Sequence, residues 1–212
     1  MECTIPSFSN LTVQSNFNLQ QFLGRWYEIK WLSDEYHNES SIWRDYSQLF
    51  QFENNSNQRL LVFGKARLIN EENCFSFGPW LIVANNSAKM IVETRDLNST
   101  TKLNWPYVIL STDYINYALI YGCMSKNYIQ DNPCDDSIVW IFSRKNSLSD
   151  EYLNPLHNII ENILCINVTK LEKTPHSEKS CYDLPSLGLK IYPMNIMLFI
   201  ILPILYLFLI YK

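Results

Sequence analysis

Short runs of alternating apolar and polar residues, separated by Asn-rich turns, make up most of this chain. Such alternation predicts strands, because successive side chains of a strand point to opposite faces of the sheet. The strands are predicted at residues 26–32, 43–52, 59–68, 73–77, 89–96, 107–111, 117–124 and 138–144, with a short last strand at 166–171. Eight short strands with no helix between them predict an all-β fold, an antiparallel meander that closes on itself as a barrel.

One helix is predicted after these strands. Asn154 can cap it, and Pro155 suits the first helical position, where a missing N–H is tolerated. From Leu156 to Leu164 apolar residues recur at helical spacing, which gives one apolar stripe that can pack on the barrel wall. We divide the chain into an N-terminal arm (1–16), a barrel domain (17–173), a polar spacer (174–193) and a hydrophobic tail (194–212).

The tail contains an apolar run, residues 196–211, that is interrupted only by Pro203. This is short for a helix that crosses a bilayer, which needs about 20 apolar residues, and no cluster of Lys or Arg follows it. Together with the polar spacer and small residues such as Ser186 and Gly188, it favours a glycosylphosphatidylinositol-anchor signal. A transmembrane helix and a cleaved or unused tail are the alternatives.

Composition narrows the class of partner. The formal charge is −4 and no basic cluster is present, which argues against nucleic acid or an anionic membrane surface as a partner. Aromatic residues make up 14% of the chain. They could line a cavity, although the preference of Tyr and Phe for strands explains them equally well.

Cysteines and glycosylation sequons indicate the secretory pathway. The cysteines are widely spaced, with no Cys-x-x-Cys, which favours disulfides over a zinc site or a redox dithiol. They are Cys3, Cys74, Cys123, Cys134, Cys165 and Cys181. Asn-x-Ser/Thr sequons occur at Asn10, Asn38, Asn54, Asn85, Asn98 and Asn167. Residues 1–25 hold no apolar run typical of a signal peptide. The numbering therefore begins after the signal, the sequence lacks a first exon, or the protein is made without one.

We predict no catalytic residue, metal or cofactor. His37, His157 and His176 have no partner in a recognisable nucleophile motif, and the few dispersed glycines form no phosphate loop. Cys74, on a predicted strand, could face the barrel interior as a free thiol, but a disulfide is favoured.

Three segments carry a family resemblance: residues 23–29 (LGRWYEI), residues 106–123, which include Asp113, and residues 140–144 (WIFSR). They resemble the conserved regions of the lipocalins, in particular the apolipoprotein D and Lazarillo branch. The resemblance implies an eight-stranded up-and-down barrel with one C-terminal helix on its wall. It also implies a barrel base in which Arg144 packs over Trp26, with Gly24 and Asp113 beside them.

The resemblance further implies a Cys3–Cys123 disulfide. The family's second bridge would need a cysteine at the position of Ser41. Cys181 must therefore pair with Cys74, Cys134 or Cys165, or stay free.

The implied function is the binding and transport of a small hydrophobic ligand such as a fatty acid, sterol or steroid, in lipid metabolism or the oxidative-stress response. The alternatives are a lipid-anchored Lazarillo-like recognition glycoprotein and an enzyme that uses a barrel thiol. No oligomeric state is predicted. From strand alternation and the resemblance together, we expect the ligand to contact Tyr46, Phe63, Trp105, Tyr107, Tyr121, Ile138, Trp140 and Phe142.

Overall fold

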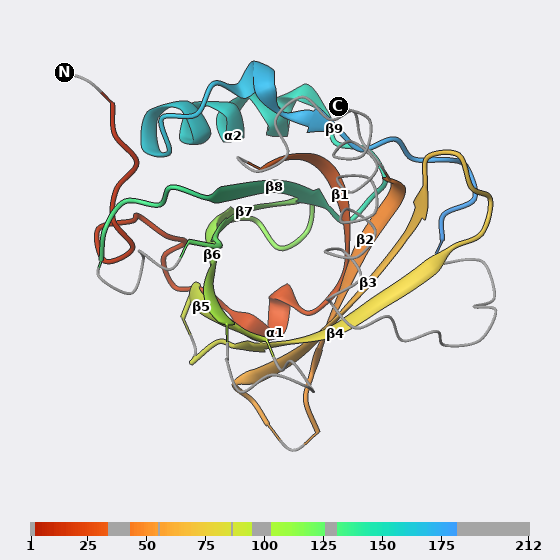
Figure 1. Ribbon diagram of the computed structural model, residues 1–212, viewed down its shortest axis with the longest axis horizontal. Coiled ribbons are helices and arrows are strands. Elements are labelled where there is room, and N and C mark those ends of the chain that lie inside the picture. The colour runs from red at the N-terminus through yellow and green to blue at the C-terminus, as the bar shows by residue number, and fades with distance from the viewer. Residues whose placement is uncertain are drawn as a thin grey trace, which may run out of the picture.

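A closed antiparallel barrel forms the body of the protein, as the alternation of the sequence predicts (Figure 1). The computed structural model describes residues 3–33, 43–54, 56–85, 87–94, 103–125 and 131–181. The strands are β1 (Gly24–Ser33), β2 (Trp43–Phe52), β3 (Arg59–Leu68), β4 (Phe75–Val83), β5 (Lys89–Thr94), β6 (Leu103–Thr112), β7 (Tyr117–Cys123) and β8 (Ser137–Ser143). Each pairs with the next, and β1 closes the barrel by pairing with both β8 and β2.

Three strand predictions need correction. β4 was predicted to end at residue 77, but it continues through Gly78, whose φ of 92° lies beside a register shift within the strand. β6 begins at Leu103, four residues before the predicted start at 107. The strand predicted at 166–171 is wrong: a 3₁₀ turn, η2 (Val168–Lys170), lies there, and the two-residue β9 (Glu172–Lys173) follows it. The Asn167 side chain accepts a hydrogen bond from the Thr169 N–H, which favours the turn over an extended backbone.

One end of the barrel is closed by the short helix α1 (Leu19–Phe22) and the aromatic residues around it. The Phe22 ring stacks on Trp26 at 5.2 Å and meets the edge of Phe50 at 5.2 Å, and all three side chains are buried. The turns β2–β3, β4–β5 and β6–β7 lie at this closed end, because the connections of a meander alternate between its two ends.

Helix α2 (Asp150–Ile163) lies outside the barrel alongside β8 (Figure 1). Leu156 and Ile160 are buried against outward-facing residues of the wall, such as Val139 and Ile141. The predicted packing helix is therefore present, but it begins at Asp150 rather than at Pro155. Two acidic residues in its first turn suit the positive end of the helix dipole, which accounts for the earlier start.

β1 and β2 pair over only part of their length, and the chain beyond α2 lies between them where they separate. β1 and β2 pair only from Gly24 to Tyr27, beyond which β9 pairs with β1 at Lys30 and Trp31. The Thr174 N–H then donates to the Ile29 carbonyl, and the Asp45 N–H of β2 donates to the Pro175 carbonyl. This inserted segment, residues 172–181, is thus part of the barrel domain, whereas the sequence predicted a polar spacer from residue 174.

Asp45 holds the inserted segment through a buried polar network. Arg67 donates to the Asp45 carboxylate at 2.8 Å, and Ser177 donates to it through its N–H at 2.7 Å and its hydroxyl at 2.8 Å. Because a buried carboxylate is stable only when its oxygens are satisfied, this network fixes both the segment and β2.

All six cysteines form disulfides, and the expected Cys3–Cys123 pairing is wrong. The chain after β7 turns back so that Cys134 lies beside Cys123, and these two pair. The N-terminal arm instead reaches the end of α2, where Cys3 pairs with Cys165. The third bridge joins Cys74 to Cys181 and secures the inserted segment.

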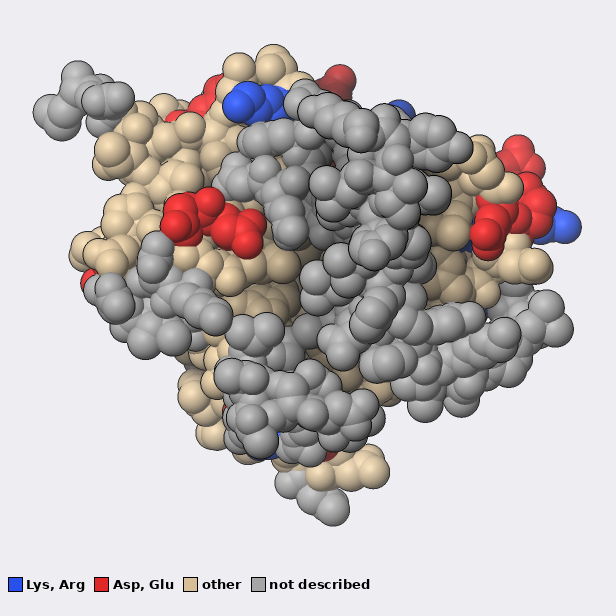
Figure 2. Space-filling view, viewed as in Figure 1, with Lys and Arg blue, Asp and Glu red and all other residues tan. Residues whose placement is uncertain are grey.

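Among the described residues no helix has the length and apolar composition needed to cross a membrane, and the predicted tail at 194–212 lies outside them. On the face shown in Figure 2, acidic side chains gather in one group toward the left and another toward the right, and basic side chains lie near the top and right edges.

Candidate functional site: the barrel interior

Aromatic side chains from β2, β6 and β8 meet inside the barrel. We call Tyr46, Trp105, Tyr107, Trp140 and Phe142 the interior cluster. The Tyr107 ring lies 5.8 Å from Trp140 and 6.1 Å from Trp105, and Tyr46 lies 6.3 Å from Phe142. Five of the residues expected to contact a ligand are therefore brought together, and Ile138 packs against the same core.

Exposure within the interior rises toward the end opposite α1. Along β8 the side chain of Phe142 is fully buried, Trp140 is 7% exposed and Ile138 is half-buried. Along β6, Ile109 is fully buried and Trp105 is half-buried. The interior therefore has one closed end and one end that approaches solvent.

Gly122 makes room for the indole rings of Trp105 and Trp140. A Cβ atom at this position would lie 2.8 Å from Ile138, 3.0 Å from Trp105 and 3.2 Å from Trp140. Any larger residue would displace an indole ring, so this glycine sets the shape of the interior.

A chain of hydrogen bonds crosses the interior between the two tyrosines. The Tyr107 hydroxyl donates to the Gln48 side-chain oxygen at 2.9 Å, and the Gln48 amide donates to the Tyr46 hydroxyl at 2.6 Å. Burial raises the pKa of both Tyr46 and Tyr107. The nearby Glu28 carboxylate adds to this effect at Tyr46, and Tyr46 and Glu28 add to it at Tyr107. Both phenols are therefore neutral and able to donate at neutral pH.

Glu28 of β1 is fully buried beside these hydrogen-bonded side chains. Its Oε1 accepts from the Trp43 indole N–H at 2.8 Å and from the Thr174 hydroxyl of the inserted segment at 2.6 Å. Its Oε2 has no hydrogen-bond partner. Burial raises the pKa of Glu28 to about 7, against the opposing effect of the two hydrogen bonds. The carboxyl group therefore titrates near neutral pH.

Two predicted ligand contacts do not face the interior. Tyr121 packs on the outer wall with Val139 and the residues beneath α2. On β3 the interior positions are Leu60, Val62 and Ala66, so Phe63 lies on the opposite face. Both expectations chose the wrong face of a strand.

The sequence reasoning missed Glu28, Gln48, Trp31 and Trp43. Glu28 and Gln48 could have been found by counting two residues from Trp26 and Tyr46, since positions i and i+2 share a face. Trp31 lies beyond a bulge between Glu28 and Lys30, which breaks that count.

The residues of the barrel base form a separate, structural group. The Arg144 guanidinium lies 3.7 Å from the centre of the Trp26 ring and donates to the carbonyls of Tyr114, Arg25 and Gln21. Gly24 has a φ of 97°, and a Cβ there would lie 3.3 Å from Arg144. The predicted stacking of Arg144 on Trp26 is therefore present, at the closed end.

Asp113 organises the β6–β7 turn at the same end. Its Oδ1 accepts from the backbone N–H groups of Ile115, Asn116 and Tyr117. Partial burial acts to raise the pKa of Asp113, but these hydrogen bonds outweigh it and lower the pKa below its usual value. The group serves the turn and does not reach the interior cluster.

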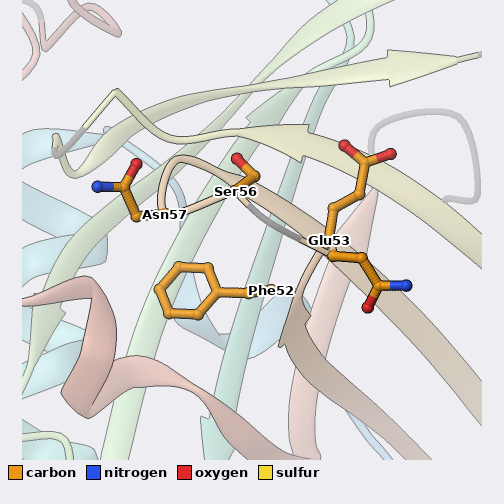
Figure 3. A pocket seen from close by; sticks show the side chains of 5 residues that line it. Phe52, Glu53, Ser56 and Asn57 are labelled. Atoms are coloured by element: carbon orange, nitrogen blue, oxygen red, sulfur yellow. The ribbon is translucent and has the colours of Figure 1, made fainter.

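An open hollow of about 640 Å³ lies beside the β2–β3 turn, lined by Phe52, Glu53, Asn54, Ser56 and Asn57. Figure 3 shows these lining side chains from close by. The Phe52 ring and the Glu53 carboxylate point in different directions (Figure 3), so these side chains do not converge on one point. The hollow is polar and open, unlike an enclosed site for an apolar molecule.

Cys74, His176 and Ser177 are engaged in structural contacts. Cys74, the candidate thiol, is bonded to Cys181. His176 and Ser177 are neighbours near Asp45, but the Ser177 hydroxyl contacts Asp45 and the His176 Nε2 contacts the Glu28 carbonyl oxygen. This histidine does not activate that serine. Within the described residues no group of three or more His, Cys, Asp or Glu is placed to hold a metal ion.

Comparison with known proteins agrees with this geometry. No family model matches the chain. Apolipoprotein D of Cavia porcellus is 32% identical over 179 residues, or 82% of this chain and 84% of that protein. Apolipoprotein D of Macaca fascicularis is 30% identical over 164 residues, or 75% of each. Among solved structures, lobster apocrustacyanin A1 matches with a TM-score of 0.58 at 22% identity, covering 78% of this chain and 83% of that one. The chain therefore belongs to the lipocalin family and is apolipoprotein D-like.

Proposed function

We propose that this protein is an extracellular lipocalin that binds and carries a small hydrophobic ligand in its barrel. The observation that carries the proposal is the interior itself, which is aromatic, sealed by Phe22 and Trp26 at one end, and progressively more exposed toward Ile138 and Trp105 at the other. Apolar and aromatic side chains around a few buried polar groups are the usual lining of a small-molecule site. Fatty acids, sterols and steroids are the candidate classes.

Secretion is the second part of the proposal. Three disulfides require an oxidising compartment. Four of the six sequons lie in the described residues, at Asn10, Asn54, Asn85 and Asn167, and all four side chains are exposed as a glycan requires. The hydrophobic tail would then retain the protein at the cell surface as a lipid anchor or as a membrane helix.

Native mass spectrometry tests this function. The full-length chain would be expressed behind a signal sequence in eukaryotic cells and collected from the medium, released from the surface by a phosphatidylinositol-specific phospholipase C, or held in lipid nanodiscs. We expect an adduct with the mass of one small lipid, and quenching of tryptophan fluorescence when that lipid is added back to the delipidated protein. Absence of any adduct, with no quenching by fatty acids, sterols or steroids, would exclude a carrier.

A second function is favoured by the tightness of the interior cluster. Trp31 and Trp43 stack at 4.8 Å, and the Trp140 ring lies 5.8 Å from Tyr107 and 6.3 Å from Trp105, so aromatic side chains fill much of the barrel. A filled, glycosylated and anchored barrel would suit cell-surface recognition. The same fluorescence titration separates the two functions, because a recognition protein would bind none of the lipids.

A further inference from the structure

The Glu28 carboxyl group is the one charged group that the described chain places fully inside the barrel beside the interior cluster. Glu28 lies two residues after Trp26 on the same face of β1, and it is 0% exposed. The tyrosines of the interior cluster respond to its charge, since the Glu28 carboxylate contributes to the raised pKa of both Tyr46 and Tyr107.

The two oxygens of this carboxyl group are used unequally. Oε1 accepts two hydrogen bonds, from Trp43 and from Thr174, whereas Oε2 accepts none. A buried carboxylate oxygen that accepts no hydrogen bond destabilises the folded state. Both existing contacts are donors, so this side chain is built as an acceptor with half of its capacity unused.

No cation of the described chain compensates this group. The other buried carboxylate, Asp45, is paired with Arg67, but no Lys, Arg or His side chain among the described residues pairs with Glu28. His176 contacts Glu28 only at its backbone carbonyl oxygen, and its Nδ1 lies 3.9 Å from Asp45 instead.

Aromatic rings lie beside the occupied oxygen of this carboxyl group. The Trp43 indole that donates to Oε1 is stacked on Trp31 at 4.8 Å, and the Tyr46 ring lies 5.8 Å from the Trp43 ring. The carboxyl group is therefore set among apolar rings, which offer no positive charge to an anion.

We propose that Glu28 selects an apolar ligand whose buried end carries a hydrogen-bond donor, an amine or an alcohol, and that it discriminates against a ligand that ends in a carboxylate. This inference rests on the proposed carrier function. The donor would hydrogen-bond to Oε2, with the apolar part of the ligand lying along the interior cluster. A carboxylate at the same place would set two negative charges together in a site of low polarity, which is strongly unfavourable.

Three probes of equal chain length test the inference: dodecylamine, dodecanol and dodecanoate. Binding to the full-length protein, prepared as described above, would be followed by tryptophan quenching, with a protein-free blank. The measurement would be made at about pH 8, where most of the Glu28 side chain is ionised. We expect the amine and the alcohol to bind about tenfold tighter than the acid, or more. Either order between the amine and the alcohol supports the inference.

The Glu28→Gln variant assigns the selectivity to this residue. It keeps the volume and an oxygen that can accept from Trp43 and Thr174, but it removes the charge. We expect the preference over dodecanoate to fall to within about threefold. The matched control is Glu161→Gln on the exposed face of α2, which should keep the wild-type preference.

The outcomes separate the inference from the function on which it rests. If all three probes bind wild type equally, or if dodecanoate binds best, the selectivity proposal is wrong and the carrier function stands. A preference that survives in Glu28→Gln also overturns it. If no probe binds, the selectivity proposal fails, and the adduct and the sterol and steroid titrations described above decide whether the carrier function fails with it. Because the wild-type series needs no variant, a folding defect in Glu28→Gln would not remove the test.

Discussion

At the scale of single residues, Arg144 and Glu28 show that the position of a charged side chain decides its role. Such a side chain either stabilises the barrel or faces the proposed ligand site. Arg144 reaches four backbone carbonyl groups and the Trp26 ring, all at the closed end. None of these contacts involves the interior cluster, so its role is to hold the base together.

Replacing Arg144 with Ala should therefore lower stability without changing ligand preference. The change removes charge-assisted hydrogen bonds and a cation–π contact, and we expect the free energy of unfolding to fall by about 2–4 kcal/mol. Urea unfolding would measure this loss, and Arg59→Ala, at a partly exposed ion pair, provides the control with a smaller effect. A changed preference among ligands with unchanged stability would contradict the assignment.

Glu28 should make stability depend on pH in a predictable direction. Its pKa rises from 4.5 to about 7 on folding, so the folded state binds the proton more tightly than the unfolded state. Stability is then lost as pH rises from 4.5 to about 7, by on the order of 2–3 kcal/mol. The buried His176, whose pKa burial lowers, adds the opposite slope below its usual pKa.

Comparison with Glu28→Gln isolates the Glu28 effect, because His176 is common to both proteins. We expect the variant to be more stable than wild type by about 2 kcal/mol near pH 8 and to lose that advantage near pH 4.5. Thermal unfolding across this range is the measurement. A difference that does not change with pH would mean that Glu28 does not titrate in this range.

The success of single-residue predictions depended on a fixed reference point. On β8 the position of Arg144 at the base fixed which face looked inward, and Trp140 and Phe142 lie as predicted. On β3 no such reference existed, and Phe63 was assigned to the wrong face. Alternation alone gives two faces without saying which is inside.

At the scale of elements, the inserted segment was the least predictable feature. Its sequence, from Thr174 to Lys179, is polar and reads as a spacer, because it is held by hydrogen bonds to Asp45, Arg67 and Glu28 rather than by an apolar pattern. The strands and α2, which bury apolar faces, were recovered from periodicity. Partners that lie far apart in the sequence left no local signal.

Removing the disulfide that secures this segment should lower the free energy of unfolding more than removing the one between β7 and β8. Cys74–Cys181 spans 107 residues and Cys123–Cys134 spans 11, and loop-closure entropy favours the longer bridge by about 1–2 kcal/mol. We expect C74A/C181A to unfold at lower denaturant concentration than C123A/C134A. The reverse order would indicate that the inserted segment contributes little to the closed barrel.

At the scale of the whole molecule, the two ends of the barrel differ in what they carry. The sequons at Asn54 and Asn85 lie on the β2–β3 and β4–β5 turns, at the closed end with α1 and Arg144. Asn38 and Asn98 lie outside the described residues. Glycans on the first pair would leave the proposed entrance free.

This arrangement predicts that the closed-end glycans can be removed without affecting binding. In the Asn54→Gln/Asn85→Gln double variant, we expect the secreted protein to lose the mass of two glycans while its affinity for the best-bound lipid stays within about twofold, because bulky surface sugars here stand away from the interior cluster. Enzymatic deglycosylation of wild type provides the control. A severalfold change in affinity would place the ligand entrance near the β2–β3 turn, and the exposure gradient along β6 and β8 would then need another explanation.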